Sequence, residues 1–191
     1  MRLFLALTFS DPERARIHEA AEPLRESGVP VQWLSPDRFH LTLKFLGDVR
    51  SDRLPGLAKA VGRVAGATRA FTLRLQGFGA FPTIRRPEVL WLGADPTPAL
   101  RCLKQDLEWG LASHGFDRET RAFHPHVTLG RTRKEEGAGA FRGLDDLAAS
   151  LDFALDIPVS SVDVVRSHLK KQKDRYTIME SLPLRSVPPR I

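Results

Sequence analysis

Two short stretches of the sequence repeat residues that could do acid–base chemistry. The chain reads FHLTL around His40 and PHVTL around His126, so each histidine is followed by an apolar residue, a threonine and a leucine. In a β-strand, alternate side chains point to the same face. His40 would then share a face with Thr42, and His126 with Thr128, while the apolar residues anchor the other face. Two such strands lying together would line one cleft with two imidazoles and two hydroxyls.

Two histidines that face one substrate can divide the work of an acid and a base. The ordinary pKa of imidazole is about 6.5, so near neutral pH one ring can be protonated while the other is not. The neutral ring takes a proton from a nucleophile, and the cationic ring gives one to a leaving oxygen. Threonine hydroxyls donate hydrogen bonds to phosphate oxygens. Opening a 2',3'-cyclic phosphate requires these groups and no metal ion.

Basic residues next to both motifs favour a phosphate substrate. Lys44 has the strand parity of His40, so we expect it on the same face. Arg131 and Arg133 follow the second motif directly. Arg131 has the parity of the apolar face, and it reaches the cleft only if the strand ends or twists near Gly130.

A metal site is the chemical alternative that the second motif allows. The tripeptide HPH places His124 and His126 on one face of a strand. A metal needs at least a third protein ligand, and the sequence shows no HExxH pattern and no cysteine partner. The single cysteine, Cys102, excludes an intrachain disulfide and is expected to be a small buried residue on a helix. We therefore expect no metal, no cofactor and a cytoplasmic protein.

The composition is that of a soluble globular protein, and its positive charge suits a polyanionic partner but does not by itself decide for one. Of the 191 residues, 42% are hydrophobic and 27% are charged, and the net charge is +6 with a pI near 10.0. Lysine and arginine near phosphates gain affinity through the release of counterions. The sequence contains no uninterrupted apolar run of about 18 residues, so we expect no membrane-spanning helix.

The periodicity of apolar residues predicts an α+β fold with mostly antiparallel strands. Several strand pairs are joined by short turns, and no glycine-rich phosphate loop is present. The tryptophans Trp33, Trp91 and Trp109 are expected in the core, whereas Phe81 and Tyr176 lie near turns and could stack on a base. The predicted strands cover residues 2–9, 31–35, 39–47, 71–82, 87–94, 124–133, 162–170 and 176–181, and the predicted helices cover 10–27, 51–65, 97–115 and 141–150.

These motifs resemble a known family. WLSPDRFHLTLKFLGDV and HPHVTLGRTR are similar to the paired HxT signatures of the 2H phosphoesterase superfamily, and within it to the bacterial and archaeal RNA 2',3'-cyclic phosphodiesterases, also called 2'-5' RNA ligases. RLFLALTF, GFGAFP before RPEVLWLG, and VVRSHLKKQKDRYTIMESLPL are similar as well. The resemblance implies one domain over residues 1–191, made of two interleaved lobes. It implies two mostly antiparallel sheets with helices on their outer faces, related by a pseudo-twofold axis around a central cleft.

The resemblance also implies an activity, the metal-independent hydrolysis of terminal 2',3'-cyclic phosphates of RNA to 2'-phosphates. Its catalytic pair falls on His40 and His126, its phosphate-binding threonines on Thr42 and Thr128, and its arginine on Arg131. We assign His126 to accepting a proton from water and His40 to protonating the departing 3'-oxygen. Ligation of RNA ends in a 2'-5' linkage would be the related reaction, with a 5'-hydroxyl in place of water and no ATP.

Two other functions remain open at this point. The chain could be a non-catalytic module that binds RNA ends through its basic residues. It could also be a cyclic phosphodiesterase of the same type that acts on a small nucleotide such as ADP-ribose 1'',2''-cyclic phosphate. In each case the expected partner is RNA with cyclic phosphate ends or a small nucleotide, and the expected state is a monomer. Lys44, Phe81 and Tyr176 complete the expected substrate-binding residues.

Overall fold

A computed structural model describes residues 1–132, 139–168 and 176–186 of the chain. The α+β class with antiparallel strands is confirmed, because every pair of named strands runs antiparallel. The strands are β1 (Arg2–Thr8), β2 (Val31–Trp33), β3 (His40–Asp48), β4 (Phe71–Thr83), β5 (Arg86–Ala94), β6 (His126–Thr132), β7 (Ala154–Val159), β8 (Ser161–Ser167) and β9 (Tyr176–Pro183). The α-helices are α1 (Asp11–Ala20), α2 (Glu22–Glu26), α3 (Leu54–Ala67), α4 (Pro98–Ala112) and α5 (Leu144–Ser150).

The strands of the described residues form one nine-stranded sheet with the order β7-β4-β5-β6-β3-β1-β8-β9, and β2 pairs with β6. Two groups of strands meet at its centre, where Leu41 of β3 pairs with Val127 of β6. The expected two sheets are therefore joined into one hydrogen-bonded sheet through this narrow contact. The pseudo-twofold relation between two lobes stays a prediction.

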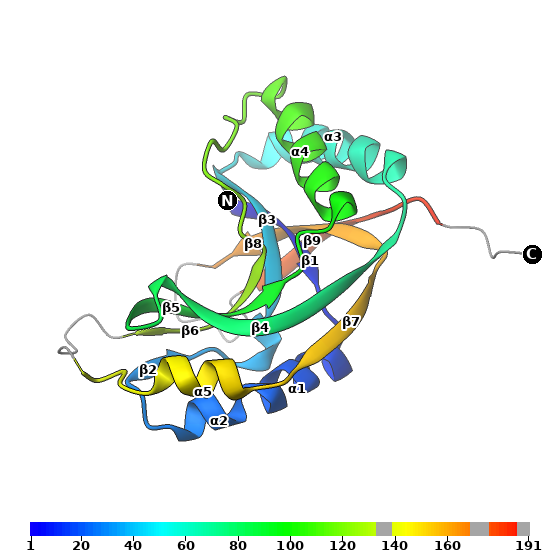
Figure 1. Cartoon of the computed structure of the whole chain (residues 1–191). Coiled ribbons are helices and arrows are strands. Elements are labelled where there is room, and N and C mark those ends of the chain that lie inside the picture. Colours follow the sequence, from blue (N-terminus) through cyan, green and yellow to red (C-terminus); the bar gives the residue numbers. More distant parts are fainter. Residues whose placement is uncertain (133–138, 169–175, 187–191) are drawn as a thin grey trace, which may run out of the picture.

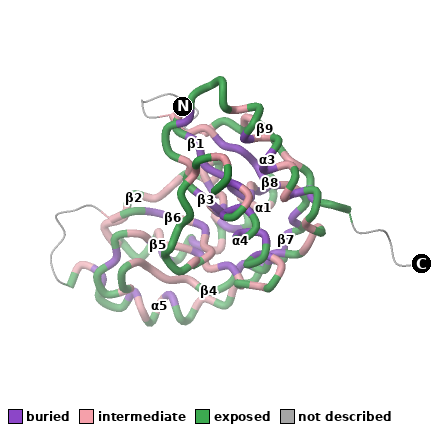
Figure 2. Tube along the Cα trace, turned by 90° about the horizontal axis from the view of Figure 1, so that it is seen from above, coloured by how far each residue is buried: buried purple, intermediate pink, exposed green. Residues whose placement is uncertain are grey.

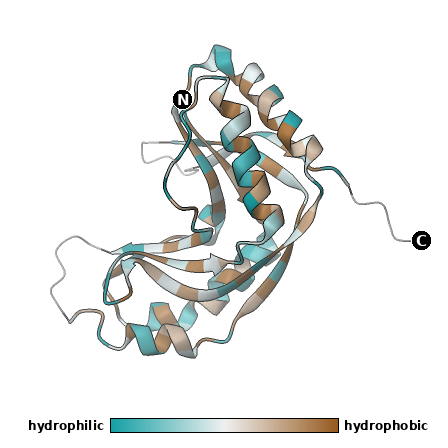
Figure 3. Ribbon diagram, turned by 45° about the horizontal axis from the view of Figure 1, so that its top comes forward, coloured by the Kyte–Doolittle hydropathy of each residue, from teal (hydrophilic) through white to brown (hydrophobic). Residues whose placement is uncertain are grey.

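The helices form two groups at opposite ends of the curved sheet. Figure 1 shows α3 and α4 side by side at one end, and α1, α2 and α5 at the other. The main core lies between the apolar face of the strands and the helices, and a smaller cluster packs α2 and α5 against β5. Figure 2 shows the buried residues along the inner strands, and Figure 3 shows hydrophobic and hydrophilic residues alternating around the helices.

The longest helix, α4, follows from local sequence signals. The Thr97 side chain accepts a hydrogen bond from the backbone N–H of Leu100, and Pro98 occupies the first turn. Leucines spaced three and four residues apart then form a fully buried stripe that fixes the helix against the sheet: Leu100, Leu103, Leu107 and Leu111. None of the helices in the described part of the chain has the length and apolar character that crossing a membrane requires.

Three local predictions were wrong, each for a physical reason. The predicted helix over 10–27 is broken into α1 and α2, because Pro23 cannot continue the hydrogen bonding of α1. Strand β7 was not predicted; it contains Pro158 and lies at the edge of the sheet, where proline is tolerated. Cys102 is exposed, because it lies beside the leucine stripe of α4 and not within it.

Each central strand carries a β-bulge directly after its His-x-Thr-Leu motif. In β3 the pairing with β1 shifts between Leu5 and Ala6, so Leu43 becomes an extra residue. In β6 the pairing with β5 shifts between Leu90 and Trp91, so Leu129 becomes an extra residue. A bulge reverses the alternation of side chains beyond it. Residues after each motif therefore lie on the opposite face from the one that simple parity predicts.

The bulge in β6 depends on the small size of Gly130. A Cβ atom at this position would lie 2.5 Å from the Val31 Cγ1 atom and 3.1 Å from the Gln32 carbonyl oxygen, both in the neighbouring strand β2. We predict that Gly130→Ala lowers the free energy of unfolding by about 1–3 kcal/mol through overpacking. Urea denaturation measures this effect. Gly56→Ala is the matched control in α3, where an added Cβ meets nothing within 4 Å, and equal stability of the two variants would contradict the prediction.

Candidate active site

The two histidines come together because their strands are neighbours. Leu41 and Val127 form the pair that joins β3 to β6, and both side chains are fully buried. The residues on either side of this pair point to the other face of the sheet. Continuing the antiparallel register by one residue places His40 opposite Thr128 and Thr42 opposite His126. The structure thus brings the four residues of the doubled motif into one group.

Both imidazoles are held in the same way. The His40 Nδ1 atom lies 2.8 Å from the Arg38 carbonyl oxygen, and the His126 Nδ1 atom lies 2.7 Å from the His124 carbonyl oxygen. A carbonyl only accepts hydrogen bonds, so Nδ1 carries the proton in each neutral ring. The Nε2 atom is then the one that exchanges protons with a substrate. Each backbone turn before the motif therefore fixes both the tautomer and the orientation of its histidine.

His40 lies in a largely buried aromatic setting. Its ring centroid is 4.9 Å from that of Phe4 and 5.0 Å from that of Tyr176. Burial lowers the pKa of His40 to about 4, and the guanidinium groups of Arg38 and Arg14 act in the same direction, while the hydrogen bond to the Arg38 carbonyl opposes them. A cavity of about 360 Å³ opens beside it, lined by Thr8, Arg14, Asp37, Phe39, His40, Val165, Tyr176 and Ile178.

His126 has a second cavity on its side of the site. Its ring lies edge-on to Phe81, with centroids 5.1 Å apart, and 6.3 Å from the ring of Trp91. Burial lowers the pKa of His126, the hydrogen bond to the His124 carbonyl raises it, and the charge of Arg131 lowers it. The cavity measures about 500 Å³ and is lined by Phe81, Trp91, Gly93, Ala94, Pro96, Arg101, Phe123, His124, Pro125 and His126.

Comparison with known proteins shows the family of the chain. Residues 9–171 match the family model described as the 2'-5' RNA ligase superfamily. The chain belongs to the 2'-5' RNA ligase superfamily. Two relatives are both named RNA 2',3'-cyclic phosphodiesterase. That of Aeropyrum pernix is 35% identical over 159 residues, which cover 82% of this chain and 85% of the relative. That of Thermotoga maritima is 34% identical over 133 residues, which cover 70% and 71%.

Solved structures of similar proteins support the same superfamily and fold. The structure of TT0787 of Thermus thermophilus superimposes with a TM-score of 0.78 at 29% identity, covering 97% of this chain and 99% of that one. The structure of Escherichia coli LigT complexed with 3'-AMP gives a TM-score of 0.73 at 26% identity, covering 96% and 97%. The architecture found here is therefore that of 2'-5' RNA ligase superfamily members.

The predicted position of Lys44 is wrong. The bulge at Leu43 turns Lys44 to the helix-covered face, where its side chain is only 3% exposed and contacts Glu108. Phe45, which simple parity puts on the face opposite to Lys44, is 70% exposed and lies across from Phe4, with ring centroids 6.1 Å apart. Lys44 is thus a structural residue of this superfamily member, and its place on the His40 face is taken by Phe45.

The same effect in β6 brings Arg131 to the site. The bulge at Leu129 places Arg131 on the face of Thr128, where it is exposed and its charge acts on His126. Phe81 lines the cavity beside His126 and Tyr176 lines the cavity beside His40; their contact with a substrate stays a prediction. Arg133 lies outside the described residues.

Sequence reasoning missed Trp91, which lines the cavity next to His126 and pairs across the strands with Thr128. A Cβ atom at Gly79 would lie 2.3 Å from the indole ring, so the ring rests directly on this glycine. The strand alternation could have shown it, because Leu90 and Leu92 take the buried face. Trp109, also expected in the core, is 57% exposed.

Three polar residues near His40 were also not anticipated. Arg14 and Arg38 each bury an Nε atom that has no hydrogen-bond partner within the described residues. The Thr8 hydroxyl, which lines the cavity, donates a 2.5 Å hydrogen bond to the buried carboxylate of Asp163. No local pattern signals these three residues, because they come from α1, from the turn before β3 and from β1, and meet only in the folded chain. A metal site built on His124 and His126 would need a third ligand. Within the described residues, no group of three His, Cys, Asp or Glu side chains is placed to hold a metal ion.

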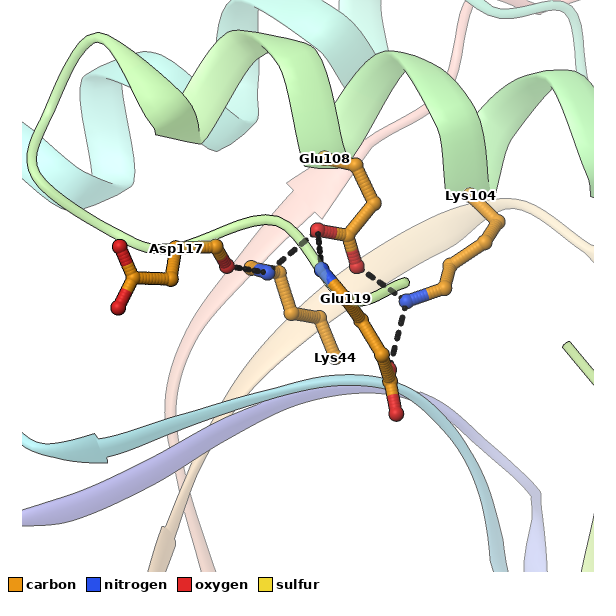
Figure 4. Close-up of polar contacts among 5 residues, drawn as sticks. All are labelled: Lys44, Lys104, Glu108, Asp117 and Glu119. Atoms are coloured by element: carbon orange, nitrogen blue, oxygen red, sulfur yellow. Dashed lines mark hydrogen bonds and ion pairs between the residues drawn. The ribbon is translucent and has the colours of Figure 1, made fainter. Parts of the chain in front are cut away.

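A buried ion-pair network connects the first motif to the segment that leads into the second. Figure 4 shows Glu108 of α4 between the ammonium groups of Lys44 and Lys104, with Lys44 Nζ 2.5 Å from the Glu108 Oε2 atom. Lys44 also donates a 2.7 Å hydrogen bond to the Asp117 carbonyl, and Glu108 accepts a 3.0 Å hydrogen bond from the backbone N–H of Glu119. Burial alone would raise the pKa of Glu108, but the two lysines outweigh it and hold that pKa below its ordinary value. Residues 117–119 are thereby fixed against α4.

We predict that Glu108→Ala lowers the free energy of unfolding by about 3–5 kcal/mol, because it leaves two buried ammonium groups without their shared carboxylate. Chemical denaturation followed by circular dichroism measures the loss. Asp52→Ala is the control, since it breaks the Arg50–Asp52 pair, whose side chains are 81% and 60% exposed, and we expect a loss below about 1 kcal/mol. A loss as small for Glu108→Ala would contradict the role of the network.

Proposed function

We propose that the protein hydrolyses the terminal 2',3'-cyclic phosphate of RNA to a 2'-phosphate and a 3'-hydroxyl. The observation that carries this proposal is the pair of histidines on neighbouring strands, each with Nδ1 tied to a backbone carbonyl and Nε2 left for proton transfer. The RNA 2',3'-cyclic phosphodiesterases among its relatives support the same substrate. Both imidazoles come from one chain, so the site is complete in a monomer.

The reaction needs one proton removed and one supplied at the phosphate. Water attacks phosphorus as His126 Nε2 takes its proton, the bond from phosphorus to the 3'-oxygen breaks, and His40 Nε2 protonates that oxygen. The hydroxyls of Thr42 and Thr128 donate hydrogen bonds to the phosphoryl oxygens, and Arg131 balances their charge. Phe81 and Tyr176 offer ring faces to the bases.

The substrate itself contributes to the charge state of the site. Because burial lowers the pKa of both histidines, both rings are neutral in the free protein near neutral pH. An anionic phosphate between the rings favours an imidazolium and raises both pKa values. The assigned proton donor, His40, is thus charged mainly when substrate is bound, since its pKa in the free protein is only about 4.

Ligation in a 2'-5' linkage is the same opening of the cyclic phosphate, with an RNA 5'-hydroxyl attacking in the place of water and the 3'-oxygen leaving as before. The presence of one cavity beside His40 and another beside His126 favours this second activity, because each can accept one of two RNA ends. Water is far more abundant than RNA ends, so we propose hydrolysis as the main reaction.

We predict that His40→Ala and His126→Ala each lower kcat on a cyclic-phosphate oligonucleotide by about 10²–10⁴-fold, the usual contribution of a general acid or base. Product analysis by chromatography measures the rates, and activity is expected to persist in EDTA. An analogue with sulfur as the 3'-leaving atom needs little protonation, because a thiol pKa is only about 8.5. It should restore activity to His40→Ala more than to His126→Ala. The reverse order would exchange the two roles, and full activity in either variant would refute the proposal.

The lowered pKa values predict an acid-shifted pH dependence. The kcat/KM profile reports the free enzyme, and it should be bell-shaped with both limbs below pH 6.5 and the lower limb near pH 4. The reactive form needs one neutral and one charged imidazole, so the two pKa values of the pair set the two limbs, whichever histidine carries each. The kcat profile should lie at higher pH, because the bound phosphate raises both pKa values. Initial-rate measurements from pH 3.5 to 9 test this, and a kcat/KM that is level between pH 6 and 8 would contradict it.

A further inference from the structure

A groove leads away from the His126 side of the site along helix α4. The cavity that contains His126 and Trp91 shares Arg101 and Phe123 with a second cavity, and each measures about 500 Å³. The second cavity is lined by Arg101, Lys104, Gln105, Glu108, Trp109, Arg118, Glu119, Thr120, Arg121 and Phe123. We call the two together the α4 groove. It continues the active site over a surface that the reaction at the phosphate does not require.

One wall of the α4 groove is a face of the helix. Arg101, Gln105 and Trp109 are spaced four residues apart, so they lie in a row along α4, on the side away from its buried leucines. Trp109 is 57% exposed. Part of its ring is therefore accessible to a ligand that enters this cavity.

The other wall is the segment that follows α4. The Arg118 guanidinium lies 3.8 Å from the centroid of the Trp109 ring, and Arg121 is exposed at the same cavity. The ion-pair network fixes this wall, since Lys44 binds the Asp117 carbonyl and Glu108 binds the Glu119 N–H. The α4 groove is therefore preformed and does not have to be ordered by its ligand.

The charges of the α4 groove select an anionic ligand. The two carboxylates that line it, Glu108 and Glu119, are both engaged by Lys104. None of the ion pairs found within the described residues involves Arg101, Arg118 or Arg121. Stacking rings combined with free guanidinium groups are how proteins bind single-stranded nucleic acid without reading its sequence.

We propose that the α4 groove binds the nucleotides upstream of the cyclic phosphate in a single-stranded RNA. A 2',3'-cyclic phosphate ends a strand, so every further nucleotide lies on its 5' side and leaves the site in one direction. Trp109 and Arg118 stack with a base, and Arg101 and Arg121 contact the phosphates. This assignment rests on the proposed function and extends it, because it makes an oligonucleotide a better substrate than a nucleoside cyclic monophosphate.

The test compares two substrates, a nucleoside 2',3'-cyclic monophosphate and a six-nucleotide RNA with the same cyclic end. Trp109→Ala should lower the ratio of oligonucleotide to mononucleotide kcat/KM about tenfold, since stacking is lost for one base. Trp109→Phe should keep most of that ratio. Arg101→Ala and Arg121→Ala should each reduce the slope of log affinity against log salt for the oligonucleotide by about 0.7, since each removes one phosphate contact. Arg63→Ala, which removes the same charge from an exposed position on α3, should leave the slope unchanged.

The outcomes separate this inference from the proposed function. If Trp109→Ala leaves the oligonucleotide kinetics unchanged, or lowers kcat/KM equally on both substrates, RNA binding in the α4 groove is refuted. The proposed hydrolysis is not affected by either result. Fluorescence anisotropy with a linear RNA that has no cyclic end measures the affinity of the α4 groove for RNA independently of catalysis. Trp109-dependent binding of this RNA by a protein that hydrolyses neither substrate would support the groove and refute the proposed function. An affinity for duplex RNA equal to that for single-stranded RNA would refute the proposal that the α4 groove binds a single strand.

Discussion

The pairing of Leu41 with Val127 is the constraint on which the site depends. This contact joins two groups of strands, and the side chains of both residues are completely buried. Because side chains alternate along a strand, burial of these two residues forces His40, Thr42, His126 and Thr128 to the other face together. The antiparallel direction then sets each histidine against the threonine of the opposite motif. The reactive geometry is thus a consequence of hydrophobic burial on the reverse side of the sheet.

Burial also supplies the electrostatics of the site. Aromatic rings pack against His40 and His126 and exclude water from the two imidazoles. This burial lowers the pKa of both histidines, and the charges of Arg14, Arg38 and Arg131 act in the same direction. Both imidazoles therefore stay neutral in the free protein near neutral pH. An anionic phosphate relieves this, because it supplies the countercharge that the solvent no longer provides. Selectivity for an anion and readiness to transfer a proton therefore have one physical origin.

The sequence predicted the class of the fold and the four central residues, because strand alternation and buried leucines act locally. It did not predict the faces of Lys44, Phe45 and Arg131, since a bulge reverses parity through pairing with another strand and leaves no reliable local pattern. Trp91 was missed by favouring the core for an aromatic residue, although Leu90 and Leu92 indicated the opposite face. Arg14 and Arg38 meet His40 only through tertiary contacts, which a single sequence does not reveal.

The two bonds from Nδ1 to the chain have a consequence for successive turnovers. Since neither ring can turn over to present its other nitrogen, each holds or lacks a proton only at Nε2. One round of hydrolysis by the proposed route leaves the former acceptor charged and the former donor neutral. That product state is already the starting state for closing the ring again, whereas another hydrolysis first requires exchange with solvent. Until a proton exchanges with solvent, the histidine that carries the charge therefore depends on whether the site last opened or closed a cyclic phosphate.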